Sequence, residues 1–174
     1  MDRQKKHPAA SAREIKALAH PLRLRIIRLC GLHELTNKQL ADRLDQDPGT
    51  VLYHIRQLLA SGFLEPVEVR TGESGALEKP YRSTGRSWTL DTALDQAGPE
   101  GPLAPVEAFQ QELREAGPNA LAGLSRFMLH LSEEDAEELN ERIHRILREY
   151  TESDKERKDQ PAYGGIFVLH RSSD

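Results

Sequence analysis

Apolar residues recur every three or four positions in four short stretches between residues 11 and 61, the spacing of amphipathic helices. Each stretch opens on a recognisable helix-start signal, either a capping box or a proline at the first helical position. The starts are Ser11 with Glu14, Pro21, Thr36 with Gln39, and Asp47 followed by Pro48. We expect Gly31 to end the second helix and Gly62 to end the fourth, which runs from Pro48 to about Ala60.

After Gly62 the apolar period changes from about 3.6 towards 2, which indicates strands. The sequence predicts an outgoing strand at 63–70, a flexible tip at 71–75, a return strand at 79–84 and a further short strand at 87–90. Pro66 lacks the amide proton of a central strand and therefore favours a sheet edge. This part of the chain is expected to form a hairpin with a long loop.

The remainder of the chain reads as a linker, more helices and a last strand. Residues 95–104 are rich in glycine and proline, which is typical of a linker. Helices are expected at 105–116, at 118–130 and from a capping pattern of Ser132 with Asp135 onward. The last helix carries an apolar stripe of Leu139, Ile143, Leu147 and Tyr150. Residues 163–170 are apolar on both faces and predict a strand.

Composition and charge exclude some classes of protein. With 37% apolar and 30% charged residues the chain can form a core, but no apolar run approaches the roughly 20 residues of a membrane span. Residues 1–95 carry 15 Lys and Arg against 12 Asp and Glu, whereas residues 96–174 carry 9 against 16. This asymmetry is expected when only the first part meets phosphate. A single cysteine and a charged start without an apolar leader favour a cytoplasmic protein.

These elements predict a mainly α fold with a small β component. Helices followed by a hairpin are the order of a winged helix-turn-helix domain, in which one short helix positions the next in the major groove of DNA. The expected plan is a flexible tail at 1–10, this domain at 11–94, a linker at 95–104 and a helical dimerisation region at 105–174 that ends in a strand.

Three stretches resemble the winged helix-turn-helix regulators of the ArsR family. They are ALAHPLRLRII at 17–27, ELTNKQLA at 34–41 and PGTVLYHIRQL at 48–58, which runs into SGFL at 61–64. The resemblance covers about half of the chain and is specific as an ordered set. It implies a transcriptional regulator, usually a repressor, that binds a two-fold DNA operator as a homodimer with half-sites about one helical turn apart.

The helix at 48–60 is the expected recognition helix. Val51, Ile55 and Leu58 share one face and belong to the core, which leaves a second set directed outward. That outward set is Thr50, Tyr53, Arg56 and Gln57, with His54 at its edge. Thr50 and Tyr53 lie near the start of the helix, where base edges are read. For Tyr53 and His54 the alternative is packing against the hairpin.

Further cations are candidates for contacts with phosphate. Arg56 and Lys38 are expected to clamp the DNA backbone, and Arg70, Lys79 and Arg82 of the hairpin are candidates for groove or phosphate contacts. The alternative for the hairpin cations is a solvated surface. Arg23, Arg25 and Arg28 are expected to serve ion pairs within the chain.

Metal-sensing relatives in this family use two cysteines on the helix before the recognition helix. The matching positions are Thr36 and Lys38, which supply no thiolate, and Cys30 is expected to be a buried, inert thiol. A second family metal site lies on a C-terminal helix, where this chain offers His130, Glu141 and His144. Spacing of this kind is common by chance on a charged helix, so we expect neither a metal nor a cofactor.

The apolar stripe in the last helix needs a partner, either within its own chain or in a second copy. We favour the homodimer, because a two-fold operator requires two copies. A strand at 166–169 also needs a neighbour, and we expect it to pair with 87–90. A small-molecule effector between the two parts of the chain is conceivable, although no residues define a pocket for it.

Four functions are alternatives to a DNA-binding regulator of this kind. The chain has no glycine-rich phosphate loop, nucleophile elbow or HExxH motif, so catalysis is not expected. A winged helix used only as a protein-interaction module is kept open by the net charge of −4. A metal-responsive regulator is the third alternative. General packaging of DNA is disfavoured because it requires a charge density that this chain does not have.

Overall fold

The computed structural model describes residues 10–72, 75–89, 98 and 101–172, and it divides into two compact units, Met1–Ala116 and Gly117–Asp174. Among the helices in these ranges, none has the length and apolar content needed to cross a membrane. Each unit is considered by itself below. All of the buried residues among those described lie in the first.

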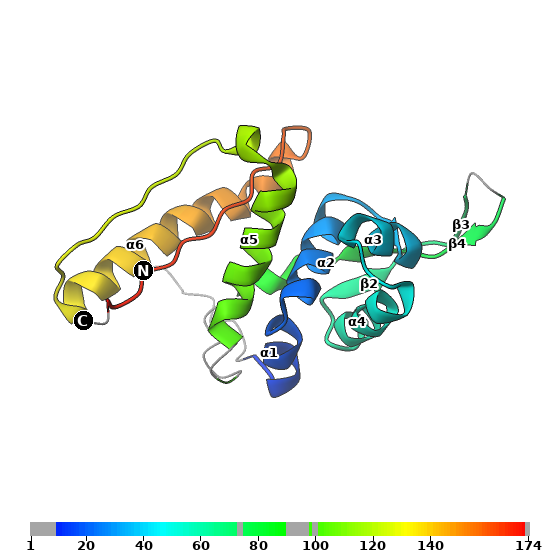
Figure 1. The fold of residues 1–174 in the computed structure, drawn as a ribbon, viewed down its shortest axis with the longest axis horizontal. Helices are drawn as coiled ribbons and strands as arrows, with labels where there is room; N and C mark the ends of the chain where they lie inside the picture. The colour runs from blue at the N-terminus through cyan, green and yellow to red at the C-terminus, as the bar shows by residue number, and fades with distance from the viewer. Residues whose placement is uncertain (1–9, 73–74, 90–97, 99–100, 173–174) are drawn as a thin grey trace. The chain divides into compact units, whose positions relative to one another are not determined.

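The first unit combines helices with a small antiparallel sheet (Figure 1). Its α-helices are α1 (Ala12–Leu18), α2 (Pro21–Leu32), α3 (Asn37–Leu44), α4 (Pro48–Ala60) and α5 (Ala104–Ala116), with 3-10 turns at η1 (Arg86–Thr89) and η3 (Gly101–Leu103). Strands β1 (Leu35–Thr36), β5 (Pro80–Ser83) and β2 (Leu64–Pro66) form one sheet in the order β1-β5-β2. Strands β3 (Arg70–Thr71) and β4 (Leu77–Glu78) form a separate two-stranded ribbon at the hairpin tip.

The helix starts expected from the sequence are confirmed. Both capping boxes are formed, and Pro21 and Pro48 occupy the first positions of α2 and α4. The expected end of α2 at Gly31 is one residue early, since the helix continues through Leu32. After α4, Gly62 adopts a φ of 73°, and a Cβ there would lie 2.8 Å from the Arg86 guanidinium. The positive φ favours glycine at this position, whereas the flexible Arg86 side chain could move away from a Cβ.

The core of the first unit lies between the helices and the sheet. Leu18, Ile26, Leu40, Ile55 and Phe63 are completely buried and come from five different segments. Each expected helix contributes its apolar face to this cluster, so the first four helices and the sheet share one core. The wing is shorter than expected, because only Leu64–Pro66 of the outgoing segment joins the main sheet.

Helix α5 packs on α2 in the first unit, whereas the sequence assigned 105–116 to the C-terminal region. Arg25, whose side chain is 7% exposed, donates to Oε1 of Gln111 at 3.1 Å and pairs with Glu115. Arg28 pairs with Glu112 at 2.5 Å. The expectation that Arg25 and Arg28 serve internal ion pairs is confirmed, and their partners are what attach α5 to the domain.

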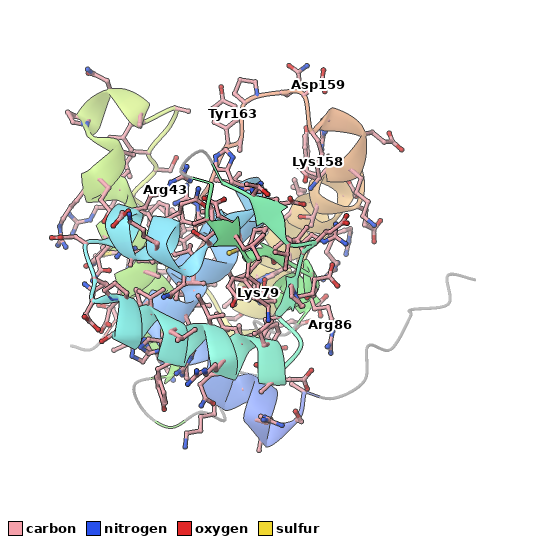
Figure 2. All side chains as sticks on the ribbon, turned by 90° about the vertical axis from the view of Figure 1, so that its right-hand side faces the viewer. Arg43, Lys79, Arg86, Lys158, Asp159 and Tyr163 are labelled. Carbon is pink, nitrogen blue, oxygen red and sulfur yellow. The ribbon has the colours of Figure 1, made fainter. Side chains whose placement is uncertain are left out.

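The second unit contains η4 (Pro118–Ala120), the long helix α6 (Glu133–Glu152) and η5 (Asp154–Arg157). The expected cap of Ser132 with Asp135 is present. Beyond the turn marked by Lys158, Asp159 and Tyr163 (Figure 2), the chain returns along α6. There the Phe167 and His144 rings lie edge to face, with 6.3 Å between their centroids. Arg171 pairs with Glu133 at 3.9 Å, so the returning segment runs antiparallel to the helix.

Two expected elements of the second unit are wrong. Beyond the 3-10 turn at 118–120, the predicted helix at 118–130 is absent, and residues 163–170 form no strand. All of residues 121–131 are exposed, and an amphipathic helix with nothing to pack against is only marginally stable. Gly164 and Gly165 weaken the predicted strand, which has no neighbour to pair with.

The expected pairing of 166–169 with 87–90 is wrong as well. Arg86–Thr89 is a 3-10 turn, and Leu90 lies outside the described residues. Residues 87–89 belong to this turn and 166–169 form no strand, so neither offers the extended backbone that ladder hydrogen bonds require. Half of the expected linker at 95–104 lies outside the described residues. Of the other half, Gly98 is described singly, Gly101–Leu103 forms η3 and Ala104 begins α5.

Candidate nucleic-acid interface

Helices α3 and α4 are joined by a short turn that fixes their relative direction. Asp45 ends α3 in the left-handed conformation, with a φ of 50°. Oδ1 of Asp47 accepts hydrogen bonds from the backbone of Gly49 at 2.8 Å and Thr50 at 3.1 Å, which satisfies the free amides at the start of α4. Nδ2 of Asn37 donates to the carbonyl of Pro48 at 3.1 Å, so the two helix starts are also bonded directly.

The faces of α4 follow the expected division. Val51, Ile55 and Leu58 are completely buried. The outward set is exposed: Thr50, Tyr53 at 57%, Arg56 and Gln57. Leu52 is partly buried between the two faces. The helix therefore offers one polar, solvent-facing side along its length, and Lys38 on α3 is exposed as well.

His54 is the one residue of this predicted set that the structure buries. Its side chain is 6% exposed and lies against the His20 ring, with 4.5 Å between ring centroids. Its partner is therefore His20, which caps the start of α2, rather than the hairpin. Burial, together with the smaller effects of the charges of His20 and Arg23, lowers the pKa of His54 to about 4. A buried neutral ring cannot reach a duplex, so the structure does not support His54 as a DNA contact.

The hairpin cations are exposed but partly neutralised. Arg70 pairs with Glu78 at 3.2 Å, and Arg82 pairs with Glu65 at 2.6 Å across the β2–β5 ladder. Hydrogen bonding to Glu65 raises the pKa of Arg82. Lys79, marked in Figure 2, is exposed and has no ion pair within the described residues. Of the three hairpin candidates, Lys79 is therefore the one whose charge is most available to bind a phosphate.

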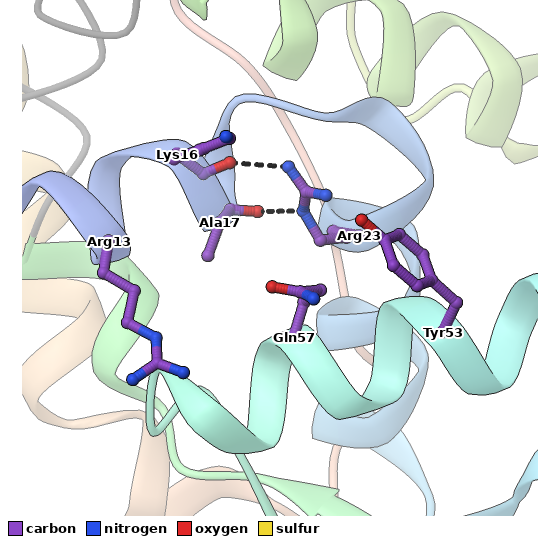
Figure 3. Close-up of a pocket in the computed structure, with 6 residues that line it drawn as sticks. All are labelled: Arg13, Lys16, Ala17, Arg23, Tyr53 and Gln57. Carbon is purple, nitrogen blue, oxygen red and sulfur yellow. Dashed lines mark hydrogen bonds between the residues drawn. The ribbon is translucent and has the colours of Figure 1, made fainter.

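A pocket of about 240 Å³ lies beside the outward face of α4 (Figure 3). It is lined by Arg13, Lys16, Ala17, Arg23, Tyr53 and Gln57. Arg23 was expected to form an ion pair, but its guanidinium instead donates to the carbonyls of Ala17 and Lys16, each at 2.5 Å. Arg23 thereby satisfies free carbonyls at the end of α1 and joins α1 to α2.

Residues 18–67 match the family model of a helix-turn-helix domain. No curated protein matches the chain. Among solved structures, the chain is similar to the crystal structure of the transcriptional regulator SlyA, with 18% identity, coverage of 75% of this chain and 74% of that chain, and a TM-score of 0.30. The matched segment contains α2, α3, α4 and β2, and the hairpin follows it directly.

The first unit contains a winged helix-turn-helix domain. Within it, α3 and α4 are the helix-turn-helix pair and β2 to β5 form the wing. The match ends at Val67, so it includes the whole of the predicted recognition helix but not the cations of the wing.

Sequence reasoning missed Arg13 and Lys16 as part of this surface. They lie three positions apart on α1 and therefore on one side of that helix, next to Tyr53 and Gln57 of the winged helix-turn-helix domain. The spacing was visible in the sequence. What the sequence could not show is that this side of α1 lies next to α4.

The remaining candidate chemistry is sparse. Cys30 is buried, and burial raises the pKa of its thiol to about 12, which confirms the expected inert thiol. Within the residues that the structure describes, no group of three or more His, Cys, Asp or Glu side chains could hold a metal. The stripe of α6 is partly buried at Leu139 and Ile143 and exposed at Leu147 and Tyr150, by 49% and 63%.

Proposed function

We propose that the protein is a transcriptional regulator of the ArsR-like kind that binds double-stranded DNA with α4 as its recognition helix and acts in the cytoplasm. The observation that carries this proposal is the polar face of α4. Thr50, Tyr53 and Arg56 are exposed on a helix that is capped, fixed to α3 and contained in a matched helix-turn-helix segment. Thr50 and Tyr53 are the proposed base contacts, and Arg56, Gln57, Lys38 and Lys79 are proposed contacts to the backbone.

The proposal includes a homodimer that binds a two-fold operator and represses transcription. Two copies of α4 are needed to read two half-sites, and each chain must then supply a surface that holds its copy. Within the second unit, none of the described residues from 117 to 172 is buried, although α6 carries an apolar stripe there. Covering the stripe of Leu139, Ile143, Leu147 and Tyr150 with the same stripe of a second copy removes this apolar area from water.

The test is DNA binding as a function of salt. The purified protein is used to select fragments of genomic DNA, and its affinity for a selected fragment is then measured at several salt concentrations. Arg56→Ala is expected to weaken binding to all sequences alike and to lower the slope of log affinity against log salt by about one unit per bound protomer. Arg114→Ala is the matched control. Arg114 is also exposed, but it lies on α5, which packs on α2 and is not part of the proposed interface.

Two outcomes would contradict this function. If Arg56→Ala leaves both affinity and slope at the wild-type values, Arg56 is not in the interface. If the wild-type protein binds no duplex even at low salt, the winged helix serves protein interaction instead. The ion pairs of Arg70 and Arg82 favour that second function, because they neutralise positive charge on the wing that would otherwise attract DNA.

A further inference from the structure

The pocket between α1 and α4 has a lining that suits an anion. Apart from Ala17, every side chain around it carries a hydrogen-bond donor, and none of them is a carboxylate. Three of the donors are cations, on Arg13, Lys16 and Arg23. The other two are the Tyr53 hydroxyl, which Figure 3 shows beside Arg23, and the Gln57 amide, which rises from α4 toward the pocket.

The backbone acceptors at this pocket are already used. The carbonyls of Lys16 and Ala17 accept hydrogen bonds from Arg23, so they do not compete for a bound ligand. The same bonds hold the Arg23 guanidinium in place beside Tyr53 (Figure 3). Arg13 and Lys16 are exposed, and their charges are therefore available to a ligand that arrives from solvent. A group that offers several oxygens and negative charge is the chemistry that this arrangement recognises.

The pocket lies beside the part of α4 that would be close to the DNA backbone if the start of the helix reads the bases. Tyr53 and Gln57 are one helical turn apart and face the same side. Gln57 lies about 10 Å along the helix from Thr50, because each residue advances an α-helix by about 1.5 Å. The major groove is about 12 Å wide. A helix whose first turn reaches base edges therefore brings Gln57, and the pocket beside it, to the level of the phosphates that border the groove.

We propose that this pocket receives a phosphate of the DNA backbone beside the major groove, and that Arg13 and Lys16 of α1 are the contacting cations. This inference rests on the proposed function, since it needs α4 in the groove. It extends the interface beyond the helix-turn-helix pair and the wing to a helix that precedes the matched segment. Arg23 positions the lining by joining α1 to α2, and Gln57 donates a neutral hydrogen bond to the same phosphate.

The experiment compares two double variants of the full chain on one selected DNA fragment. Arg13→Ala with Lys16→Ala removes both contacting cations, and Arg114→Ala with Lys158→Ala removes the same two charges from other exposed positions. The first double variant is expected to lower the slope of log affinity against log salt by about one unit per bound protomer, because one phosphate contact is lost, while the control keeps the wild-type slope. Arg13→Lys with Lys16→Arg retains both charges and is expected to retain the slope. Circular dichroism confirms that each variant is folded.

A second measurement separates a backbone phosphate from a free anion. Inorganic phosphate is titrated calorimetrically into the wild-type protein and the Arg13→Ala, Lys16→Ala variant without DNA. An unchanged salt slope in that variant overturns the inference while leaving DNA binding by α4 in place. An unchanged slope together with phosphate binding that only the wild type shows assigns the pocket to a free anion, which also overturns it. If the wild type binds no duplex, the proposed function fails first, and this inference fails with it.

Discussion

Protonation of the buried His54 gives a prediction whose size follows from the structure. His54 is 6% exposed, contacts His20, and has a buried Nδ1 with no hydrogen-bond partner. Folding lowers its pKa from an ordinary 6.5 to about 4, mainly through burial. The unfolded chain therefore binds this proton more tightly than the folded one, and the free energy of unfolding must fall as pH drops from about 6.5 towards 4.

The expected loss can be worked out from that shift. Above pH 6.5 the ring is neutral in both states and contributes no pH dependence. At pH 5 it is mostly protonated when unfolded and mostly neutral when folded, which costs about 2 kcal/mol of stability relative to pH 7. The pKa of His20 is also lowered, again mainly by burial, and its loss adds to that of His54 in the same direction.

Chemical denaturation at pH 7, 6 and 5, followed by circular dichroism, measures this loss. The test variant is His54→Leu, which removes the titrating ring and keeps an apolar side chain in the core. We expect it to lie within about 1 kcal/mol of the wild type at pH 7 and to lose about 2 kcal/mol less between pH 7 and pH 5. His33→Leu is the control, because His33 is exposed at the end of α2. A His54→Leu variant with the full pH dependence of the wild type would refute the reasoning.

Two further predictions concern contacts between segments. Leu147→Glu places a charge in the α6 stripe and should convert a dimer to a monomer in analytical ultracentrifugation. Arg145→Gln changes the net charge by the same amount on the opposite side of the helix and should leave the dimer intact. A wild-type protein that is monomeric at all concentrations would contradict the dimer. In urea denaturation, Glu115→Ala should cost about 2 kcal/mol of stability, because it leaves the guanidinium of Arg25, 7% exposed, without its carboxylate. Arg25→Met should cost less, because the carboxylate of Glu115, 56% exposed, can return to water. The reverse order would contradict that explanation.

Local signals predicted the winged helix-turn-helix domain well, and the reason is physical. Capping boxes such as Ser11 with Glu14, and the Asp47–Pro48 start of α4, act through hydrogen bonds that span at most three residues. Such bonds form whatever the rest of the chain does. The inner face of α4 was predictable for a similar reason, since Val51, Ile55 and Leu58 can be buried together by one rotation of the helix.

The errors arise where an apolar pattern has no partner. Residues 118–130 and 163–170 carry the apolar spacing of regular elements, yet the second unit buries none of their side chains. Periodicity states which face an element would bury, but the free energy that stabilises the element comes from the surface that covers that face. Nothing local in the sequence marks whether such a surface lies in the same chain.

The environments of single side chains on α4 were decided by contacts distant in sequence. His54 and Tyr53 are adjacent, and both lie near the boundary between the two faces of the helix. His20, thirty-four positions earlier, covers one of them and leaves the other exposed beside Arg23 and Gln57. The same approach of the α1–α2 corner to α4 that withdraws His54 from the interface builds the cationic pocket with Arg13 and Lys16. One packing contact therefore sets both where α4 can be touched and which charges stand next to it.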